Sequence, residues 1–241
     1  MRLAILDYGL FEVYANGRRI GIPGYYIESG DRRILVDTGF HRDYLADPLG
    51  VCLSDGLGAF GRLIEYTDMQ NPTAQLGLLG VSPSDITDLV LTHGHVDHVG
   101  RIDEFPQATL YVSAVERARP TPIYWNGQSR IAWPANKTIT VDTPTEIVPG
   151  VCLIPTPGHT MGHLSLVLTL PAFGTVILAA DAISRPDELA DDRYADAEDP
   201  HAARQSAHML RQRATQDAAW LVYGHCPQQW QSMRRAPYWY D

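Results

Sequence analysis

The segment His93-Gly94-His95-Val96-Asp97-His98 directly follows a largely apolar run from Ile86 to Thr92. Alternation along an extended segment places His93 and His95 on the same side, and Asp97 and His98 at the start of the next helix can face the same cavity. A lone histidine pair is usually a satisfied structural feature, but four candidate ligands in one loop are hard to explain in that way. The segment therefore predicts a metal site at a strand end, in a fold whose other strands deliver further ligands.

Further candidate ligands occur where other predicted strands end. His163 closes the segment Thr156-Pro157-Gly158-His159-Thr160-Met161-Gly162-His163, Asp181 follows the apolar run 176–180, and His225 follows the run 221–224. Strand ends are where open α/β folds place their ligands. For His159 the sequence favours a supporting role, in which it orients the Pro-Gly turn or a ligand. Cys226 is interpreted as a small buried filler rather than a ligand.

The strand and helix pattern predicts an α/β fold. The first residues form a meander with turns at Asn16-Gly17 and Ser29-Gly30-Asp31, and from Asp85 onward strands and helices alternate. Helices are predicted at 113–119, with Ser113 as N-cap, and at 199–216. Two halves that each combine strands and helices indicate a four-layer αββα sandwich, two sheets face to face with helices outside. Strands are predicted at 3–14, 25–28, 34–36, 86–92, 109–112, 138–141, 146–148, 151–154, 164–170, 175–179 and 220–223.

The combined pattern resembles the metallo-β-lactamase superfamily. It consists of HxHxDH at 93–98, a TPGHTMGH turn at 156–163, an aspartate that ends a strand and a late Gly-His, and the likeness extends from Ile27 to Pro227. The resemblance implies the metallo-β-lactamase type of αββα fold and two metal ions. One ion would be held by His93, His95 and His163 and the other by Asp97, His98 and His225, and Asp181 would bridge both.

Imidazole and carboxylate ligands suit divalent first-row metals. Zinc is the first choice, and iron, manganese and cobalt also accept this ligand set. Two ions about 3.5–4 Å apart can lower the pKa of a shared water and polarise an ester carbonyl. Asp97, beside the second metal, can carry the proton to the leaving alkoxide. Asp97 and Asp181 are therefore the predicted catalytic residues of a metal-dependent hydrolase.

Within the superfamily, the sequence is most similar to the N-acyl-homoserine lactone lactonases and pyridoxolactonase, which implies quorum-quenching chemistry on a lactone. The likeness rests on Asp37-Thr38-Gly39, the Leu/Gly stretch 76–80, the segment 148–151, the TPGHTMGH turn and Gly224-His225. A bridging aspartate, and the lack of a lysine near the late histidine, separate the chain from true β-lactamases. Those lactonases carry a tyrosine three residues after the bridging aspartate, where this chain has Ser184, so Tyr194 is the candidate replacement.

A mostly apolar substrate pocket is expected from 40–70 and 120–135. Its candidate residues, with those near the bridging aspartate, are Phe60, Tyr124, Trp125, Ser184 and Tyr194. The alternative activity is a thioesterase similar to glyoxalase II, or another carboxylic ester hydrolase, in which Arg234 or Arg235 could meet a carboxylate. A third interpretation is a non-catalytic or redox protein that binds iron preferentially and whose metal pair serves oxygen chemistry or sensing.

Composition narrows the partners and the location. The length of 241 residues suits one domain, 1–241, and the net charge of −9 disfavours nucleic acid. The arginine pairs Arg18/Arg19, Arg32/Arg33 and Arg234/Arg235 are scattered, and are interpreted as solvated turn charges. No secretory signal or membrane span is visible and the three cysteines lie far apart, so we expect a cytoplasmic protein without disulfides. The aromatic tail 237–240 is either packing or a subunit contact, which leaves a homodimer possible.

Overall fold

Two β-sheets pack face to face in the computed structural model, which describes residues 1–125, 129–194 and 196–241. The first sheet is mixed, with parallel pairs from β3 to β7. Its order is β4 (Gly61–Glu65), β1 (Arg2–Val13), β2 (Arg18–Ser29), β3 (Arg32–Val36), β5 (Asp88–Val90), β6 (Thr109–Val112) and β7 (Thr138–Thr140). The second sheet has the order β12 (Trp220–Val222), β11 (Gly174–Leu178), β10 (Leu164–Leu170), β9 (Val151–Pro155) and β8 (Thr145–Val148), and is also mixed.

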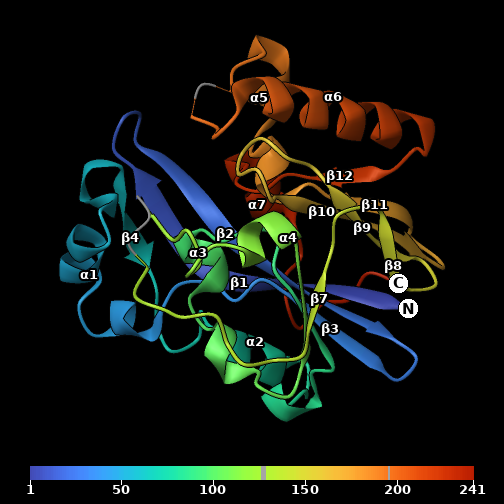
Figure 1. Cartoon of the computed structure of the whole chain (residues 1–241), viewed down its shortest axis with the longest axis horizontal. Coiled ribbons are helices and arrows are strands. Elements are labelled where there is room, and N and C mark those ends of the chain that lie inside the picture. The colour runs from blue at the N-terminus through green and yellow to red at the C-terminus, as the bar shows by residue number, and fades with distance from the viewer. Residues whose placement is uncertain (126–128, 195) are drawn as a thin grey trace.

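Helices cover the outer faces of both sheets (Figure 1). On the side of the first sheet lie α1 (Pro48–Ser54), α2 (Pro72–Leu78), α3 (Val96–Val99) and α4 (Ala114–Arg117). On the side of the second sheet lie α5 (Pro186–Asp191) and α6 (Pro200–Gln216), and α7 (Pro227–Ser232) packs near β2. Short 3₁₀ helices are η1 (Arg42–Leu45), η2 (Leu57–Ala59), η3 (Pro83–Asp85), η4 (Ile102–Glu104) and η5 (Ala180–Ile183). This arrangement confirms the predicted αββα sandwich.

Strand alternation divides the buried apolar residues among the three interfaces of the four layers. On β1, Leu3 and Ile5 face the second sheet, while Leu6 and Tyr8 belong to the cluster beneath the helices of the first sheet. On β10, Leu166 packs between the sheets. The two-residue period of a strand thus gives each sheet two buried faces.

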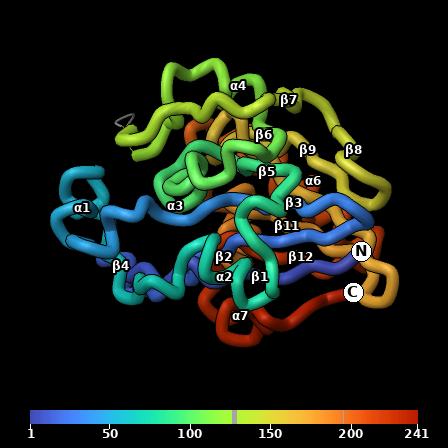
Figure 2. The backbone as a smooth tube through the Cα atoms, turned by 90° about the horizontal axis from the view of Figure 1, so that it is seen from below, coloured from blue at the N-terminus to red at the C-terminus, as the bar shows by residue number. Residues whose placement is uncertain are grey.

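The two ends of the chain lie side by side (Figure 2). Leu3 donates its N–H to the Tyr240 carbonyl at 2.7 Å, and the Tyr240 N–H returns a bond to the Leu3 carbonyl at 2.8 Å. These bonds extend the pairing of β1 into the C-terminal segment. None of the helices in the described part of the chain combines the length and apolarity that crossing a bilayer requires.

The sequence missed β4 in the 40–80 region, because this short edge strand carries the exposed residues Arg62 and Glu65. Asn16-Gly17 does connect two paired strands, and Ser113 caps α4 by accepting the Glu116 N–H. The long helix begins at Pro200, where Asp199 accepts two backbone N–H groups. The types of the helices and strands were therefore predicted better than the short strand at the edge of the sheet and the residues at which elements begin and end.

The ligand loop is locked to the turn that follows β3. Thr38 donates its N–H to the His98 carbonyl at 2.7 Å, and Gly100 donates to the Gly39 carbonyl at 2.8 Å. A Cβ on Gly100 would lie 2.2 Å from the backbone nitrogen of His41. Such a contact is far below van der Waals separation, so only glycine allows α3 to approach this turn.

Gly100→Ala should lower the free energy of unfolding by about 1–3 kcal/mol, because backbone must move to admit the methyl group. Gly77→Ala is the matched control, since Gly77 lies in α2 and its added Cβ meets nothing within 4 Å. Its expected effect is a gain of up to about 1 kcal/mol from helix propensity. Urea denaturation of both variants measures the difference, and equal stabilities would contradict the close packing inferred at Gly100.

Candidate metal centre

The first ligand group consists of His93, His95, His159 and Asp181, whose ligand atoms lie within 4.8 Å of one another. His95 Nδ1 lies 3.0 Å from His93 Nε2 and 3.0 Å from His159 Nε2. Asp181 Oδ2 lies 3.2 Å from His159 Nε2 and 3.9 Å from His93 Nε2. Three imidazole nitrogens and one carboxylate oxygen therefore surround a common point.

The second ligand group consists of Asp97, His98 and His225. Asp97 Oδ2 lies 3.6 Å from His98 Nε2 and 3.5 Å from His225 Nε2. The other oxygen of Asp181, Oδ1, lies 3.2 Å from His225 Nε2 and 3.8 Å from His98 Nε2. Asp181 thus presents one oxygen to each group, which is the position of a bridging carboxylate.

Both sheets contribute to these groups. The loop after β5 carries His93 and His95, and α3 carries Asp97 and His98. From the second sheet, His159 follows β9, Asp181 follows β11 in η5, and His225 follows β12. The ligands therefore meet where strand ends of the two sheets come together, as the sequence predicts.

Asp37 orients the second ligand group through hydrogen bonds to His98 and to Thr92. Its carboxylate accepts the Thr92 N–H at 2.9 Å, the Thr92 hydroxyl at 2.8 Å and the His98 Nδ1–H at 2.8 Å. His225 donates its Nδ1–H to the Gly21 carbonyl at 3.0 Å. These bonds fix the tautomers and leave the Nε2 lone pairs of both histidines for a cation.

The geometry differs from the prediction at the TPGHTMGH turn, where His159 rather than His163 joins the first group. His163 Nε2 accepts the Asp181 N–H at 3.1 Å, and its Nδ1 lies 2.8 Å from the Thr156 hydroxyl. Both ring nitrogens therefore have partners within the protein. Through this bond to Nε2, His163 holds the backbone N–H of Asp181 in place. By these distances His159 joins the first group, and the ligand role of His163 stays a prediction.

The pKa shifts of the ligand histidines indicate that the centre favours the binding of positive charge. Burial, and then neighbouring imidazoles, lower the pKa of His93 and of His95, so both rings are neutral donors of a lone pair. Although burial acts in the opposite direction, the carboxylates of Asp97 and others raise the pKa of His98 to about 10, and Asp181 above all raises the pKa of His225 to about 9. The second group therefore binds protons in the absence of a cation.

The donor set fits two divalent ions. Among the described residues, Asp181 Oδ1 and His98 Nε2 are buried atoms without a hydrogen-bond partner, although both face the other ligands. Buried polar atoms are nearly always satisfied, so such orphans indicate a missing partner. Nitrogen and oxygen ligands without positioned thiolates suit first-row divalent metals.

A cavity of about 540 Å³ opens onto both groups, with His95, Asp97, His159, Asp181 and His225 in its wall. Phe60, Trp125, Ser184 and Tyr194 line it, as predicted for a substrate pocket. Tyr124 does not, because it is fully buried and its N–H donates to the Gly94 carbonyl at 2.7 Å, behind the ligand loop. Phe40 and Leu57, in the predicted region 40–70, also line it. The sequence missed the rest of the wall, which comprises Phe11, Arg18, Ile20, Ile22, Val96, Ala182, Arg185, Glu188, Arg193, Asp196, Ala197 and Ala203.

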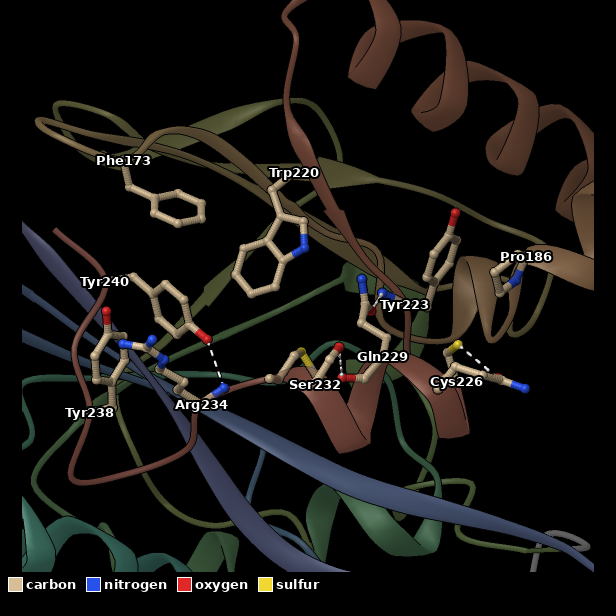
Figure 3. A pocket seen from close by; sticks show the side chains of 12 residues that line it. Phe173, Pro186, Trp220, Tyr223, Cys226, Gln229, Ser232, Arg234, Tyr238 and Tyr240 are labelled. Carbon is tan, nitrogen blue, oxygen red and sulfur yellow. Dashed lines mark hydrogen bonds between the residues drawn. The ribbon is translucent and has the colours of Figure 1, made fainter.

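A second hollow, of about 630 Å³, lies away from the metal ligands. The rings of Phe173, Trp220 and Tyr240 pack against one another there in tilted and edge-on arrangements, and Arg234 lies over the Tyr238 ring (Figure 3). Arg235 instead pairs with Asp7, at 3.1 Å. Neither arginine lines the cavity at the metal ligands, so the carboxylate contact considered for a thioesterase is not available from them.

Comparisons with known proteins agree with this geometry. A family profile described as Metallo-beta-lactamase superfamily matches residues 19–225. An N-acyl homoserine lactonase of Bacillus thuringiensis is 28% identical over 228 residues, which are 92% of this chain and 88% of the relative. The N-acyl homoserine lactonase AttM of Azorhizobium caulinodans is 32% identical over 239 residues, with the same two coverages of 92% and 88%.

Solved structures share the fold. A structure of an N-acyl homoserine lactone hydrolase with the product N-hexanoyl-L-homoserine bound at its catalytic metal center has a TM-score of 0.86 and 24% identity, and the match covers 99% of this chain and 98% of that one. The dizinc quorum-quenching lactonase AidC has a TM-score of 0.66 and 19% identity, with 98% of this chain and 92% of that one covered. At these identities the likeness establishes the architecture.

Asp37→Ala should weaken binding of one metal ion by about 10–100-fold, because His98 loses the acceptor that fixes its ring. Asp88→Ala is the control, since Asp88 is also a fully buried carboxylate but pairs with Arg32 at the far end of β5. Competition with a chromogenic chelator measures both metal affinities. Equal affinities in the two variants would show that Asp37 does not orient a ligand.

Proposed function

The chain belongs to the metallo-beta-lactamase superfamily, and on that premise we propose that it is a dinuclear metal-dependent lactonase. Its substrates would be N-acyl-homoserine lactones or related lactones, so that the activity would quench quorum signals. The observation that carries the proposal is Asp181, whose two oxygens face two separate groups of buried imidazoles at the floor of one cavity. The relatives named as N-acyl homoserine lactonases support the substrate class.

We assign one ion to His93, His95 and His159, and the other to Asp97, His98 and His225, with Asp181 shared. This proposal uses His159, which lies 3.2 Å from Asp181 Oδ2, where the sequence predicts His163. Zinc is the proposed metal, since tetrahedral and five-coordinate zinc accept such nitrogen and oxygen ligands. When bound, the two ions would activate a water at neutral pH and polarise the substrate carbonyl.

The chain's own residues would orient the substrate and move the proton. Asp97 lines the cavity beside His225 and is the proposed carrier of the proton that the leaving alkoxide takes up. Tyr194 also lines the cavity, and its hydroxyl is buried with no partner in the described ranges. That free hydroxyl is the proposed replacement for the lactonase tyrosine, whose position in this chain is Ser184. Phe60 and Trp125 would pack on the acyl portion.

The ligand assignment predicts different outcomes for two histidines four residues apart. His159→Gln should reduce the bound metal from two ions toward one, because a ligand nitrogen is lost. His163→Gln should keep both ions at saturating metal, since its nitrogens bond the Asp181 N–H and Thr156 within the protein. Elemental analysis after dialysis measures the content. Loss of an ion from His163→Gln alone would restore the sequence assignment.

Turnover of the zinc-loaded protein on N-acyl-homoserine lactones of several acyl lengths tests the activity. Ring opening releases a proton, so a pH-indicator assay follows any lactone. We expect hydrolysis that is lost with Asp181→Asn, because the shared carboxylate no longer offsets the repulsion between two cations. S-Lactoylglutathione and neutral aryl esters serve as the comparison substrates. Inactivity on every lactone, together with good thioester or aryl-ester turnover, would contradict a lactonase.

A further inference from the structure

Arg18 turns inward from the start of β2. Its side chain lines the cavity at the metal ligands, whereas the adjacent Arg19 is 71% exposed and lies 3.8 Å from Glu12. Arg18 Nε is buried and has no hydrogen-bond partner, and its guanidinium pairs with no carboxylate among the residues that the structure describes. A buried guanidinium N–H without an acceptor is costly, because water is lost and nothing replaces it. The sequence interpretation of this pair as solvated charges therefore does not hold for Arg18 Nε, although the residue as a whole is only half-buried.

Arg185 reaches the same cavity from the other side. It lies four residues after Asp181, just before α5, and its Nε is a second buried donor without a partner in the described ranges. Its Nη2 lies 3.4 Å from Glu188 Oε1, while Glu188 Oε2 accepts the Ser184 N–H at 2.8 Å. Burial lowers the pKa of Arg18 and Arg185 lowers it further, while Glu188 and Asp187 act in the opposite direction. Two cationic groups thus face one space.

The charge balance of the cavity wall differs from that of the chain. The chain has a net charge of −9. Apart from the metal ligands, the wall contains three arginines, Arg18, Arg185 and Arg193, and two carboxylates, Glu188 and Asp196. Arg193 is 79% exposed and pairs with Asp191 at 3.4 Å, so Arg18 and Arg185 face Glu188 and Asp196 in the rest of the wall. This part of the wall is neutral, in contrast to the chain. Its two Nε–H groups, which have no partner in the part of the chain that the structure describes, suit the single charge of a carboxylate better than a doubly charged phosphate.

We propose that Arg18 and Arg185 form an anion subsite for a carboxylate of the substrate. The preferred substrate is then a related lactone or ester that carries one negative charge away from its scissile bond, rather than an uncharged N-acyl-homoserine lactone. The subsite lies within reach of the metal centre, because Arg18 is three residues from Gly21, whose carbonyl holds His225, and a strand advances by about 3.3 Å per residue. The β1–β2 hairpin that carries Arg18 extends toward the side of the molecule on which α5 lies (Figure 1).

This inference rests on the proposed hydrolase function and adds a preference to it. An apolar wall of Phe11, Phe60 and Trp125 would hold the carbon chain between the two ends of such a substrate. Guanidinium groups suit the far end because they offer several donors in a planar fork that a carboxylate can accept. The product would carry two carboxylates, one present from the start and one formed by hydrolysis.

The test compares two esters with the same leaving group, 4-nitrophenyl hemiglutarate, which carries a carboxylate, and the neutral 4-nitrophenyl butyrate. The ratio of their kcat/KM values is measured for the zinc-loaded wild type, Arg18→Gln, Arg185→Gln and the control Arg19→Gln. We expect the ratio to favour hemiglutarate and to fall by about tenfold or more in Arg18→Gln and in Arg185→Gln, mainly through KM, because a charge-assisted hydrogen bond is lost. Arg19→Gln should keep the wild-type ratio, and Arg18→Lys should restore part of it.

Calorimetric titration with monomethyl glutarate separates failure of this inference from failure of the hydrolase proposal. Two results would overturn the anion subsite without affecting the hydrolase proposal. One is turnover of both esters without a charge preference, and the other is an equal ratio of kcat/KM values in Arg18→Gln and Arg19→Gln. Absence of turnover on any ester, with binding of monomethyl glutarate that weakens in Arg18→Gln but not in Arg19→Gln, would support the subsite and reject the hydrolase. Equal binding to all variants would also overturn the subsite.

Discussion

The carboxylate of Asp181 is the point at which both ligand groups meet, and the rest of the molecule is built to hold it there. Its oxygens lie 3.2 Å from His159 and 3.2 Å from His225, which belong to different loops of the second sheet. His163 bonds its backbone N–H, and His93 approaches from the first sheet. Burial makes an unpaired carboxylate costly, so these contacts, and a cation, are needed to keep it in place.

The αββα architecture and most of the metal ligands could be predicted because they depend on short patterns. The period of two in the strands and the spacing within residues 93–98 are local signals. The choice between His159 and His163 depends on distant contacts of the turn. A Cβ on Gly158 would lie 2.0 Å from the Ala203 nitrogen, and the Glu198 N–H donates to the His159 carbonyl at 3.1 Å. Packing against α6 therefore helps to place the His159 ring in the cavity wall, and spacing alone does not contain that information.

The substrate pocket was predicted less completely, for the same physical reason. Three arginine pairs look alike in the sequence, but tertiary packing gives them different roles: Arg32 pairs with the buried Asp88, Arg235 pairs with Asp7, and Arg18 turns into the cavity. Tyr124 was expected in the pocket beside Trp125, yet its backbone has a positive φ of 59° and its side chain is fully buried. Aromatic character identified the region, and backbone direction decided which ring is accessible.

The shared carboxylate also has a thermodynamic consequence for metal loading. An ion in the first group would order Asp181 and the loop that carries it, so the second group would then be organised at a smaller entropic cost. Repulsion between the ions opposes this effect but is reduced by the negative charge between them. We therefore expect binding of metal to the two sites to be linked. The protein with one ion bound should be a minor species whenever the ordering of Asp181 outweighs the repulsion between the ions.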